Sequence, residues 1–429
     1  MAEQQSPGLK LEEENRRLKR AIEELSILND LGRAISASLD SQEIMQTIIR
    51  RSLRSVNAEQ GVITLVDERA SQPMKTLVRT TVSSSEHEQF QLNQALLGWM
   101  YLNKKPLLLN KPSEDERFRG VRWEGSIRTL LCVPLIVKSD LKGVLTAFNK
   151  RSEEGFSDED LRLLAIIAAQ SSQVIENARL YEEEKAFLAM QEEVRLASKI
   201  QSELLPKAAP VLPGYEIAGK SIPAQVVGGD YFDFITLDKD RLAICLGDVT
   251  GKGLPASLLM ANLQATLRGQ SVLCPSPNEC LTRSNRLLYL STSPEKFATL
   301  FFAHLDSKSH TLHFSNAGHD FPFLFSDRES PDRLKAGGVM LGAFEEYAFE
   351  EGSVALKPGD VLVISSDGIS EAMNPGLEQF GEDRLQSVIR KHREASPSVL
   401  IDRIIEAVRM HAGSQPQSDD MTLIVVKRT

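Results

Sequence analysis

The feature that most constrains this fold is an uninterrupted stretch in the middle of the chain. Residues 158–205 contain neither glycine nor proline. Within it, a spacing of three and four residues joins Phe187, Met190, Val194, Ala197, Gln201 and Leu204. This pattern predicts one long helix that ends at Pro206. Such a helix either transmits a rotation or register change between the parts that it joins, or is a rigid spacer.

Acidic residues stand beside three apolar strands that the sequence predicts after this helix. They are Asp248 after 242–246, Asp367 after 361–365, and Asp419 before 423–426. Each alone is more simply a turn or capping residue. If folding brings them together, their repulsion is relieved by a proton or a cation. Oxygen ligands without histidine or cysteine favour Mg²⁺ or Mn²⁺, and a pair of such ions activates water for phosphoryl transfer.

Six ordered blocks support this chemistry through a family resemblance. They are VVGGDYFD, GDVTGKGLPAS, FATLFFAHLD, SNAGHDFPFLF, PGDVLVISSDGISEA and SDDMTLIVV. Together they resemble metal-dependent PPM-type serine/threonine phosphatases, above all the bacterial SpoIIE-type branch, which dephosphorylates regulators in sigma-factor partner-switching pathways. The resemblance covers roughly residues 190–429. It implies a two-sheet β-sandwich flanked by helices, with two Mn²⁺ or Mg²⁺ ions at one end between the sheets.

The same resemblance implies a set of metal ligands. Asp248 would bridge both ions, and the backbone carbonyl of Val249 would reach the second ion. Asp367 and Asp419 would complete the shell of the first ion, with water at the remaining positions.

Further site residues follow from the resemblance and from one departure. Asp230 matches the acidic position that organises metal-bound water, with Gly229 and Asp420 as supporting residues. Thr250 stands where animal-type members have a histidine proposed as general acid, and the arginine that captures phosphate in those enzymes is not evident. The leaving oxygen then takes its proton from metal-bound water or another group. His319 is one candidate, although a turn or packing role is the simpler interpretation.

The N-terminal part begins with a heptad pattern. Its core positions are Leu11, Asn15, Leu18, Ile22, Leu25 and Asn29. Leucine at d with asparagine at a favours a parallel two-stranded coiled coil, and hence a homodimer. The alternative is an amphipathic helix that packs on its own domain.

An α+β domain is predicted next, with an antiparallel sheet and helices on one face. The predicted elements are helices 41–56 and 94–102, strands 61–67, 130–137 and 143–149, and a closing helix that Ser157 starts. The blocks LGRAISASLDSQEIMQTII, LLCVPLIVKSDLKGVLTAFNK and GFSDEDLRLLAIIAAQSSQVIENARLYEEE resemble a GAF sensory domain. GAF domains bind small ligands or simply dimerise, so the ligand of this one stays unknown.

One part of this domain resembles the signature of cyclic-nucleotide-binding GAF domains. Asn149, Lys150, Phe156 and Asp160 match it, but Leu161 stands where the signature has glutamate. A cyclic nucleotide is therefore only a minor alternative among the possible ligands.

Composition narrows the partners and the compartment. The formal net charge of −9 argues against nucleic acid, and no apolar run approaches the ~20 residues that span a bilayer. The charged first thirty residues do not resemble a signal peptide. The four cysteines form no CxxC pair, which favours a reducing cytoplasm. Cys132 is a structural thiol in the simplest interpretation and an anchor for a prosthetic group in the alternative.

These observations predict four segments and one leading function. The segments are a coiled-coil helix at 1–25, a GAF domain at 26–177, a helical coiled-coil linker at 178–205 and a phosphatase domain at 206–429. The function is metal-dependent hydrolysis of phosphoserine or phosphothreonine on a protein, by resemblance an anti-sigma-factor antagonist. A GAF ligand or an activating protein would regulate it by moving helices predicted at 254–270 and 278–289, so that Asp248 and Asp367 reach metal-binding geometry only in the active dimer.

Two other functions compete with this prediction. One is a catalytically silent dimeric scaffold that binds a signalling partner, against which the retained aspartates argue. The other is a nucleotide hydrolase or kinase that uses residues 251–253 as a phosphate loop. That segment lacks the GxxxxGK[ST] spacing, and Gly253 occupies the position of the required hydroxyl.

Overall fold

The computed structural model describes residues 41–66, 74–80, 94–123, 126–293, 295–328 and 330–429. The coiled coil predicted at 1–25 lies outside the described residues. The chain divides into two compact units, with the boundary between Leu188 and Ala189. This boundary falls inside the predicted linker, and each unit is described by itself. None of the helices in the described ranges is long and apolar enough to cross a membrane.

The N-terminal unit contains one antiparallel sheet with the strand order β2-β1-β5-β4-β3. Its strands are β1 (Ala58–Val66), β2 (Met74–Thr80), β3 (Leu107–Leu109), β4 (Leu130–Val137) and β5 (Asp140–Lys150). Lys138 and Ser139 have positive φ in the tight turn that joins β4 to β5. Two short 3-10 helices, Pro112–Glu114 and Glu116–Phe118, follow β3.

Helices cover both faces of this sheet. Helix α2 (Ser41–Ser55) and the first turns of α4 (Asp158–Leu204) pack on one face, whereas α3 (Gln94–Asn103) packs on the other. The prediction of helices on one face is therefore wrong. The reason is that successive strand residues are apolar, so Ile63 joins the core beneath α2 while Val62 joins the core beneath α3.

Helix α4 begins with reciprocal capping bonds. The Asp160 N–H donates to Ser157 Oγ at 3.2 Å, and the Ser157 N–H donates to Asp160 Oδ2 at 2.8 Å. Lys150 Nζ lies 2.6 Å from both oxygens of Asp160, which ties the end of β5 to the helix. Asn149 Oδ1 accepts a backbone N–H at 2.8 Å. The residues that resemble a cyclic-nucleotide signature thus bond to their own domain.

All four cysteines are free and buried. Burial raises the pKa of Cys132 and that of Cys280 to about 12. These thiols are therefore protonated at neutral pH, and Cys132 has the surroundings of a small core residue.

The C-terminal unit contains two packed sheets. The first has the order β13-β10-β9-β8-β7, with β14 also paired to β10, and the second has the order β12-β11-β15-β16-β6. The first comprises β7 (Tyr231–Thr236), β8 (Arg241–Val249), β9 (Ala298–Asp306), β10 (Thr311–Ala317), β13 (Gly337–Gly338) and β14 (Gly352–Ala355). The second comprises β6 (Tyr215–Ile222), β11 (Phe323–Phe325), β12 (Asp332–Arg333), β15 (Val361–Ser365) and β16 (Met421–Arg428).

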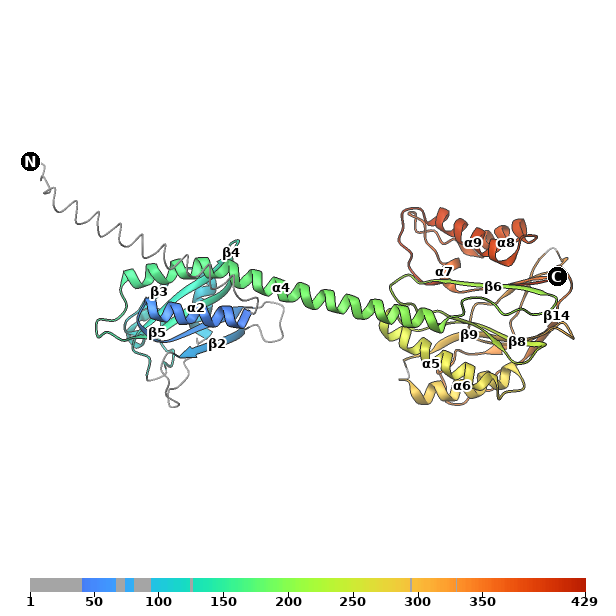
Figure 1. Cartoon of the computed structure of the whole chain (residues 1–429), viewed down its shortest axis with the longest axis horizontal. Coiled ribbons are helices and arrows are strands. Elements are labelled where there is room, and N and C mark those ends of the chain that lie inside the picture. Colours follow the sequence, from blue (N-terminus) through green and yellow to red (C-terminus); the bar gives the residue numbers. More distant parts are fainter. Residues whose placement is uncertain (1–40, 67–73, 81–93, 124–125, 294, 329) are drawn as a thin grey trace, which may run out of the picture. The chain divides into compact units, whose positions relative to one another are not determined.

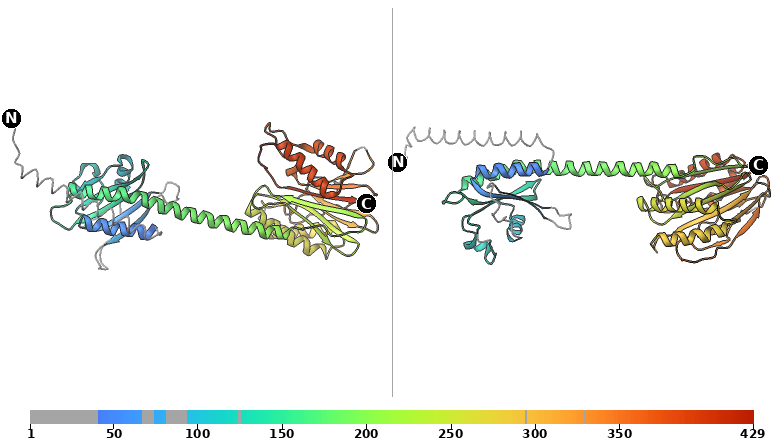
Figure 2. Two further views of the ribbon diagram at one scale, coloured as in Figure 1. Left: turned by 45° about the horizontal axis from the view of Figure 1, so that its top comes forward. Right: turned by 60° about the horizontal axis from the view of Figure 1, so that its bottom comes forward.

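Helices flank the two sheets and make a four-layer sandwich. Between the sheets lies a core that includes Ile244 and Phe301 from the first sheet and Ile364 and Ile424 from the second. The outer helices are α5 (Leu254–Ser271) and α6 (Pro277–Ser291) on the first sheet, and α7 (Asp367–Ser370), α8 (Gly381–His392) and α9 (Pro397–Ala412) on the second. Figure 1 shows the yellow and red helices on opposite sides of the strands, and the views in Figure 2 agree. The predicted sandwich is confirmed.

Candidate active site

Two antiparallel strand pairs place the predicted aspartates at the ends of the sheets. Strand β7 pairs with β8, so Asp230, just before β7, and Asp248, near the end of β8, lie at the same end of the first sheet. Strand β15 pairs with β16, so Asp367, just after β15, and Asp419, just before β16, lie at the same end of the second sheet. Asp248 and Asp419 line one small cavity, and the charges of Asp367 and Asp419 raise the pKa of Asp248, so these two ends meet at one end of the sandwich.

Asp248 has the environment of a carboxylate that needs a positive partner. Burial, followed by the charges of Asp367, Asp419 and Asp420, raises the pKa of Asp248 to about 7. Burial and then Asp419 also raise the pKa of Asp367. Without a cation, the carboxyl of Asp248 therefore keeps its proton to a much higher pH than an ordinary aspartate does.

Asp230 is the most enclosed of these carboxyls, with 4% of its surface exposed. Burial, and after it the charge of Asp248, raises the pKa of Asp230 well above its ordinary value, although the hydroxyls of Ser366 and Thr422 act in the opposite direction. Its Oδ2 atom is buried and has no hydrogen-bond partner. The fold thus holds one buried carboxyl oxygen without a hydrogen-bond partner, on a group that also experiences the charge of Asp248.

Gly229 lets the loop before β7 approach the end of β8. A Cβ atom at Gly229 would lie 3.2 Å from both Asp248 Oδ1 and the Val249 carbonyl oxygen. A larger residue would therefore fill the space in front of these oxygens. A cavity of about 10 Å³ lies here, lined by residues that include Gly229, Asp248 and Asp419. It has room for about one water-sized sphere.

Asp419 and Lys252 form an ion pair beside this cavity. Lys252 Nζ lies 2.9 Å from Asp419 Oδ2 and donates to the Ser418 carbonyl oxygen at 2.7 Å. The pKa of Lys252 is raised, first by its hydrogen bond with Asp419. The ammonium of Lys252 therefore neutralises part of the negative charge at the site.

Asp420 accepts backbone hydrogen bonds, whereas the adjacent Asp419 forms an ion pair with Lys252. Its Oδ2 accepts the N–H groups of Gly229 at 2.6 Å and of Asp230 at 3.2 Å, and its Oδ1 accepts the Ala224 N–H at 2.7 Å. A carboxylate with three backbone donors is bound firmly. Asp420 thus holds the loop that contains Gly229 and Asp230 against the start of β16.

The donors at this end of the sandwich fit Mg²⁺ or Mn²⁺. Carboxylate oxygens of Asp248, Asp367 and Asp419, with the carbonyl of Val249 beside Gly229, form a hard all-oxygen set. In the described part of the chain, no three acidic, histidine or cysteine side chains are already grouped so that they would hold an ion.

Thr250 and His319, the two residues considered for proton donation, are both bonded within the fold. Thr250 Oγ1 accepts the Phe297 N–H at 3.2 Å. The His319 N–H donates to Asn316 Oδ1 at 2.7 Å, and His319 Nδ1 lies 3.1 Å from Thr299 Oγ1. Burial lowers the pKa of His319 to about 4, so its ring is neutral at neutral pH. This geometry fits the turn and packing role of His319.

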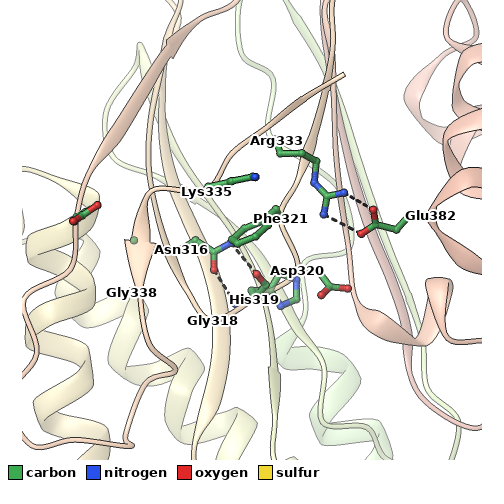
Figure 3. Close-up of a pocket in the computed structure, with 11 residues that line it drawn as sticks. Asn316, Gly318, His319, Asp320, Phe321, Arg333, Lys335, Gly338 and Glu382 are labelled. Carbon is green, nitrogen blue, oxygen red and sulfur yellow. Dashed lines mark hydrogen bonds and ion pairs between the residues drawn. The ribbon is translucent and has the colours of Figure 1, made fainter. Parts of the chain in front are cut away.

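A cleft of about 630 Å³ lies in the C-terminal unit and is lined by residues that include His319, Asp320 and Arg333. Figure 3 shows Arg333 facing Glu382 across it, and the two side chains form hydrogen bonds of 2.6 and 3.0 Å. Lys335 Nζ lies 5.8 Å from the ring centroid of Phe321. Asp320 also lines the cleft, and its charge contributes to the raised pKa of Asp367 after burial, Asp419 and Glu371.

Sequence reasoning missed two residues of this site. The sequence pattern around Lys252 suggested only a phosphate loop, which its spacing does not fit. Its position between two glycines, four residues after Asp248, does however indicate that it lies close to the site. Gln201 was counted only as part of the helical spacing, yet its side chain bonds to Gly228. No local pattern predicts that second contact, because the partners are 27 residues apart.

Comparison with known proteins defines the class of both units. Residues 238–429 match the family model described as Stage II sporulation protein E (SpoIIE), and residues 38–176 match that of a GAF domain. The chain therefore contains a GAF domain followed by a phosphatase domain of the SpoIIE type.

Individual relatives place the chain more closely. Phosphoserine phosphatase RsbU of Bacillus subtilis is 29% identical over 255 residues, which cover 58% of this chain and 75% of RsbU. Protein IcfG of Synechocystis is 30% identical over 263 residues, which cover 55% of this chain but only 41% of IcfG. The solved SiaA-PP2C domain of Pseudomonas aeruginosa is 23% identical, with a TM-score of 0.50 over 57% of this chain and 98% of that domain. This last similarity establishes a PP2C-like fold.

Proposed function

We propose that this protein hydrolyses phosphoserine or phosphothreonine on a protein substrate and that it requires Mn²⁺ or Mg²⁺. The observation on which this rests is the meeting of Asp248 with Asp367 and Asp419, from two different sheets, at one end of the sandwich. RsbU, which is named a phosphoserine phosphatase, supports the choice of phosphorylated residue.

The residues of the chain have separate tasks in this proposal. Asp248, Asp367, Asp419 and the carbonyl of Val249 would hold the ions. Bound divalent ions would activate water and neutralise the phosphoryl oxygens. Asp230 would orient the attacking water, or receive its proton, at the unpaired Oδ2 atom. Gly229 keeps the space before Asp248 open for a small group.

The central experiment measures hydrolysis of a phosphoserine peptide by the full chain, with manganese and with a chelator. We expect Asp248→Asn and Asp419→Ala to lower manganese-dependent kcat by at least about a thousandfold, because each removes charge that holds the ions. Asp327→Asn, a change at an exposed aspartate, is the matched control and should retain full activity. Equal activity of Asp248→Asn and the wild type would refute the proposal.

The same assay separates this function from a silent scaffold. The scaffold hypothesis predicts no manganese-dependent hydrolysis of any phosphopeptide by the wild-type chain. It also predicts that Asp248→Asn leaves partner binding unchanged.

We propose that the substrate is a phosphorylated anti-sigma-factor antagonist in the cytoplasm, as the resemblance to the SpoIIE-type branch implies. A protein substrate would reach into the cleft beside Asp367, where Lys335 is exposed. We expect Lys335→Glu to raise KM for the phosphoprotein by about tenfold, the loss of one interfacial charge contact, without changing hydrolysis of p-nitrophenyl phosphate. An unchanged KM would exclude Lys335 from the docking surface.

Regulation by the GAF domain is part of the proposal. A GAF ligand or activating protein, both unidentified, would act through α4 on α5 and α6 in a parallel homodimer. Helix α5 begins directly after the turn that contains Lys252, which forms an ion pair with Asp419. A small movement of α5 would therefore shift this turn relative to Asp419 and change the geometry of the site. Activity that does not respond to dimerisation would contradict this mechanism.

A further inference from the structure

A short hairpin between α7 and α8, residues 372–380, presents an apolar side chain to solvent. Its two arms pair through Met373 and Gln379, and the Phe380 N–H donates to the Ala372 carbonyl oxygen at 2.8 Å. Leu377, in the turn of the hairpin, is 76% exposed. Single exposed leucines are common on protein surfaces, so the exposure of Leu377 does not by itself indicate a function.

The backbone of Leu377 has a conformation that leucine rarely adopts. Its φ is +60°, in the left-handed region, where the Cβ atom comes close to the following carbonyl oxygen. Among the described non-glycine residues with positive φ, Leu377 alone has an apolar side chain. Glycine or asparagine would fit this position with less strain. Because Leu377 lies outside the core, packing within the fold does not offset the strain, which points to a contact with another molecule.

Hydrogen bonds hold the turn of this hairpin in one conformation. Asn374 Oδ1 accepts the N–H groups of Gly376 at 2.9 Å and of Glu378 at 3.0 Å. The Leu377 N–H donates to the Asn374 carbonyl oxygen at 2.9 Å. Beside the turn, the Glu378 carbonyl oxygen lies 2.9 Å from His411 Nε2 of α9. The turn is therefore held in place before a partner binds, which reduces the entropy lost on binding.

In the chain, the hairpin stands between a proposed metal ligand and the cleft that Lys335 lines. It follows α7, whose first residue is Asp367, and the Glu371 N–H donates to the Asp367 carbonyl oxygen at 2.8 Å. It precedes Glu382, which lines the cleft. The chain from Leu377 to Glu382 limits the distance between their Cα atoms to at most about 18 Å.

A protein substrate is large enough to cover both the cleft and the hairpin. A standard protein interface buries about 800 Å² on each partner, which corresponds to a patch about 30 Å across. A folded protein whose phosphoserine enters the site therefore extends as far as Leu377. A small phosphate ester has no surface that would do so.

We propose that Leu377 is a specificity-determining residue that anchors the protein substrate by packing against an apolar patch near its phosphoserine. The proposal rests on the proposed phosphatase function and assigns to it a docking contact outside the metal site. Leu377 contributes to binding of the phosphoprotein and takes no part in hydrolysis. A purely structural Leu377 would instead change stability and leave the KM for the phosphoprotein unchanged.

Substitutions at Leu377 in the full chain separate the effect of the side chain from that of the backbone. Leu377→Gly and Leu377→Asn both fit the positive φ and remove the apolar surface. Leu377→Met keeps an apolar side chain of similar volume. Val211→Asn is the matched control, because Val211 is 98% exposed in the same unit but outside the hairpin. Each protein is assayed with manganese on serine-phosphorylated anti-sigma-factor antagonists encoded in the same genome, and on p-nitrophenyl phosphate.

The expected results differ between the two kinds of substrate. We expect Leu377→Gly and Leu377→Asn to raise KM for the phosphoprotein by at least about tenfold, the loss of one buried leucine, with kcat unchanged. Leu377→Met should raise it by less than about threefold. Both constants for p-nitrophenyl phosphate should match the wild type in every variant, and Val211→Asn should match it with both substrates.

Thermal melting shows that the loss of affinity does not come from unfolding. Leu377→Gly should melt no lower than the wild type, because the release of backbone strain offsets the greater freedom of glycine in the unfolded chain. Weaker binding of the phosphoprotein without loss of stability is the combination that the proposal predicts.

Three results for the variants would overturn the proposal. An unchanged KM for the phosphoprotein in Leu377→Gly and Leu377→Asn would exclude Leu377 from the docking surface. An equal loss with p-nitrophenyl phosphate would assign the effect to the metal site or to another occupant of the hairpin, such as a regulatory protein. The same loss in Val211→Asn would make it a general effect of exposed apolar side chains.

Failure of the proposed function itself is visible in the wild type. A wild-type chain without manganese-dependent hydrolysis of p-nitrophenyl phosphate would refute the phosphatase function. A wild-type chain that hydrolyses this ester but none of the phosphorylated antagonists would refute the substrate class, and the docking contact with it. Neither result depends on a substitution at Leu377, so both are distinguishable from a failure of the contact alone.

Discussion

Asp248 and Asp230 are carboxyl groups that the fold makes difficult to ionise, and the cause is the same for both. Each is removed from water, and each faces other carboxyls across the end of the sandwich. A single buried acid with this cost would be a defect in a stable protein, whereas several acids that share one space are typical of a cation site. The pKa shifts of these residues therefore belong to the chemistry of the site.

The first prediction concerns the stability of the metal-free protein as a function of pH. The pKa of Asp248 is about 7 in the folded chain, against an ordinary value of 3.8, so the folded state binds the extra proton between these limits. Its contribution to stability therefore falls as pH rises from about 4 to about 7 and stays low above that range. In a chelator, the wild type should melt at a lower temperature at about pH 8 than at about pH 5.5.

Asp248→Asn is the control for this pH effect. Because the amide does not ionise, the variant should lose less stability over the same interval and should melt a few degrees above the wild type at about pH 8. The remaining slope comes from Asp230 and Asp367, whose pKa values are also raised. Parallel melting curves for the two proteins at both pH values would contradict the assignment.

The second prediction distinguishes the adjacent residues Asp419 and Asp420. Asp420→Ala removes the acceptor of three backbone N–H groups, so the free energy of unfolding of the C-terminal unit should fall by about 2–3 kcal/mol. Asp419→Ala should change it by less than about 1 kcal/mol, because the carboxylate is half-exposed and its ion pair with Lys252 is in contact with water. Urea unfolding measures both values, and equal losses would contradict the division of tasks.

Among the elements, strand β7 and helix α5 are joined by an ion pair between buried Asp233 and half-exposed Arg268. Asp233 is fully buried and accepts hydrogen bonds from Arg268 of α5 at 2.7 and 3.1 Å and from the Tyr231 hydroxyl at 2.7 Å. The bond fixes α5 to the strand that follows Asp230. The position of α5 and the loop before β7 are therefore linked through side chains as well as through the chain.

The third prediction tests this link. Arg268→Leu leaves the Asp233 carboxylate buried without its charged partner and should lower the free energy of unfolding by about 3 kcal/mol. The double variant Asp233→Asn with Arg268→Leu should be more stable than Arg268→Leu alone, because no buried charge remains. Urea unfolding of the wild type, both single variants and the double variant measures the coupling. A double variant that is less stable than Arg268→Leu would exclude an unpaired charge as the cause.

At the scale of the whole molecule, helix α4 presents apolar side chains to solvent. The exposed ones are Leu180, Tyr181, Phe187, Leu188, Met190, Leu196 and Ile200. So many exposed large apolar side chains along one helix indicate an interaction site. Together with the heptad pattern of residues 11–29, it supports a second copy of the chain as the partner that covers α4.

The fourth prediction is the oligomeric state. The full chain should sediment as a dimer at micromolar concentration, and Phe187→Glu with Leu188→Glu should weaken the dimer by at least about tenfold, because two apolar side chains that are 60% and 56% exposed in one chain become charged. Glu184→Gln on the same helix is the control and should sediment as the wild type does. A wild-type monomer at all concentrations would refute the dimer.

Most helices and strands, and the acidic residues at their ends, can be predicted from local sequence patterns. Local periodicity predicted α4, the strands around Asp248 and Asp367, and the helices after them, because glycine, proline and apolar spacing act within a few residues of one another. The resemblance to a known family added the two-sheet sandwich. The assignment of Asp248, Asp367 and Asp419 as metal ligands stays a prediction until an ion is bound.

The contacts between distant segments became known only from the three-dimensional fold. It moved α3 to the second face of the N-terminal sheet, and it separated Asp420, which holds a loop, from Asp419, which faces Lys252. It also showed that Gln201 bonds to Gly228, whereas the sequence pattern indicated only that Gln201 belongs to a helix. The physical reason is that hydrogen bonds and desolvation depend on distances in space, and the partners of Asp420 are about 190 residues away along the chain.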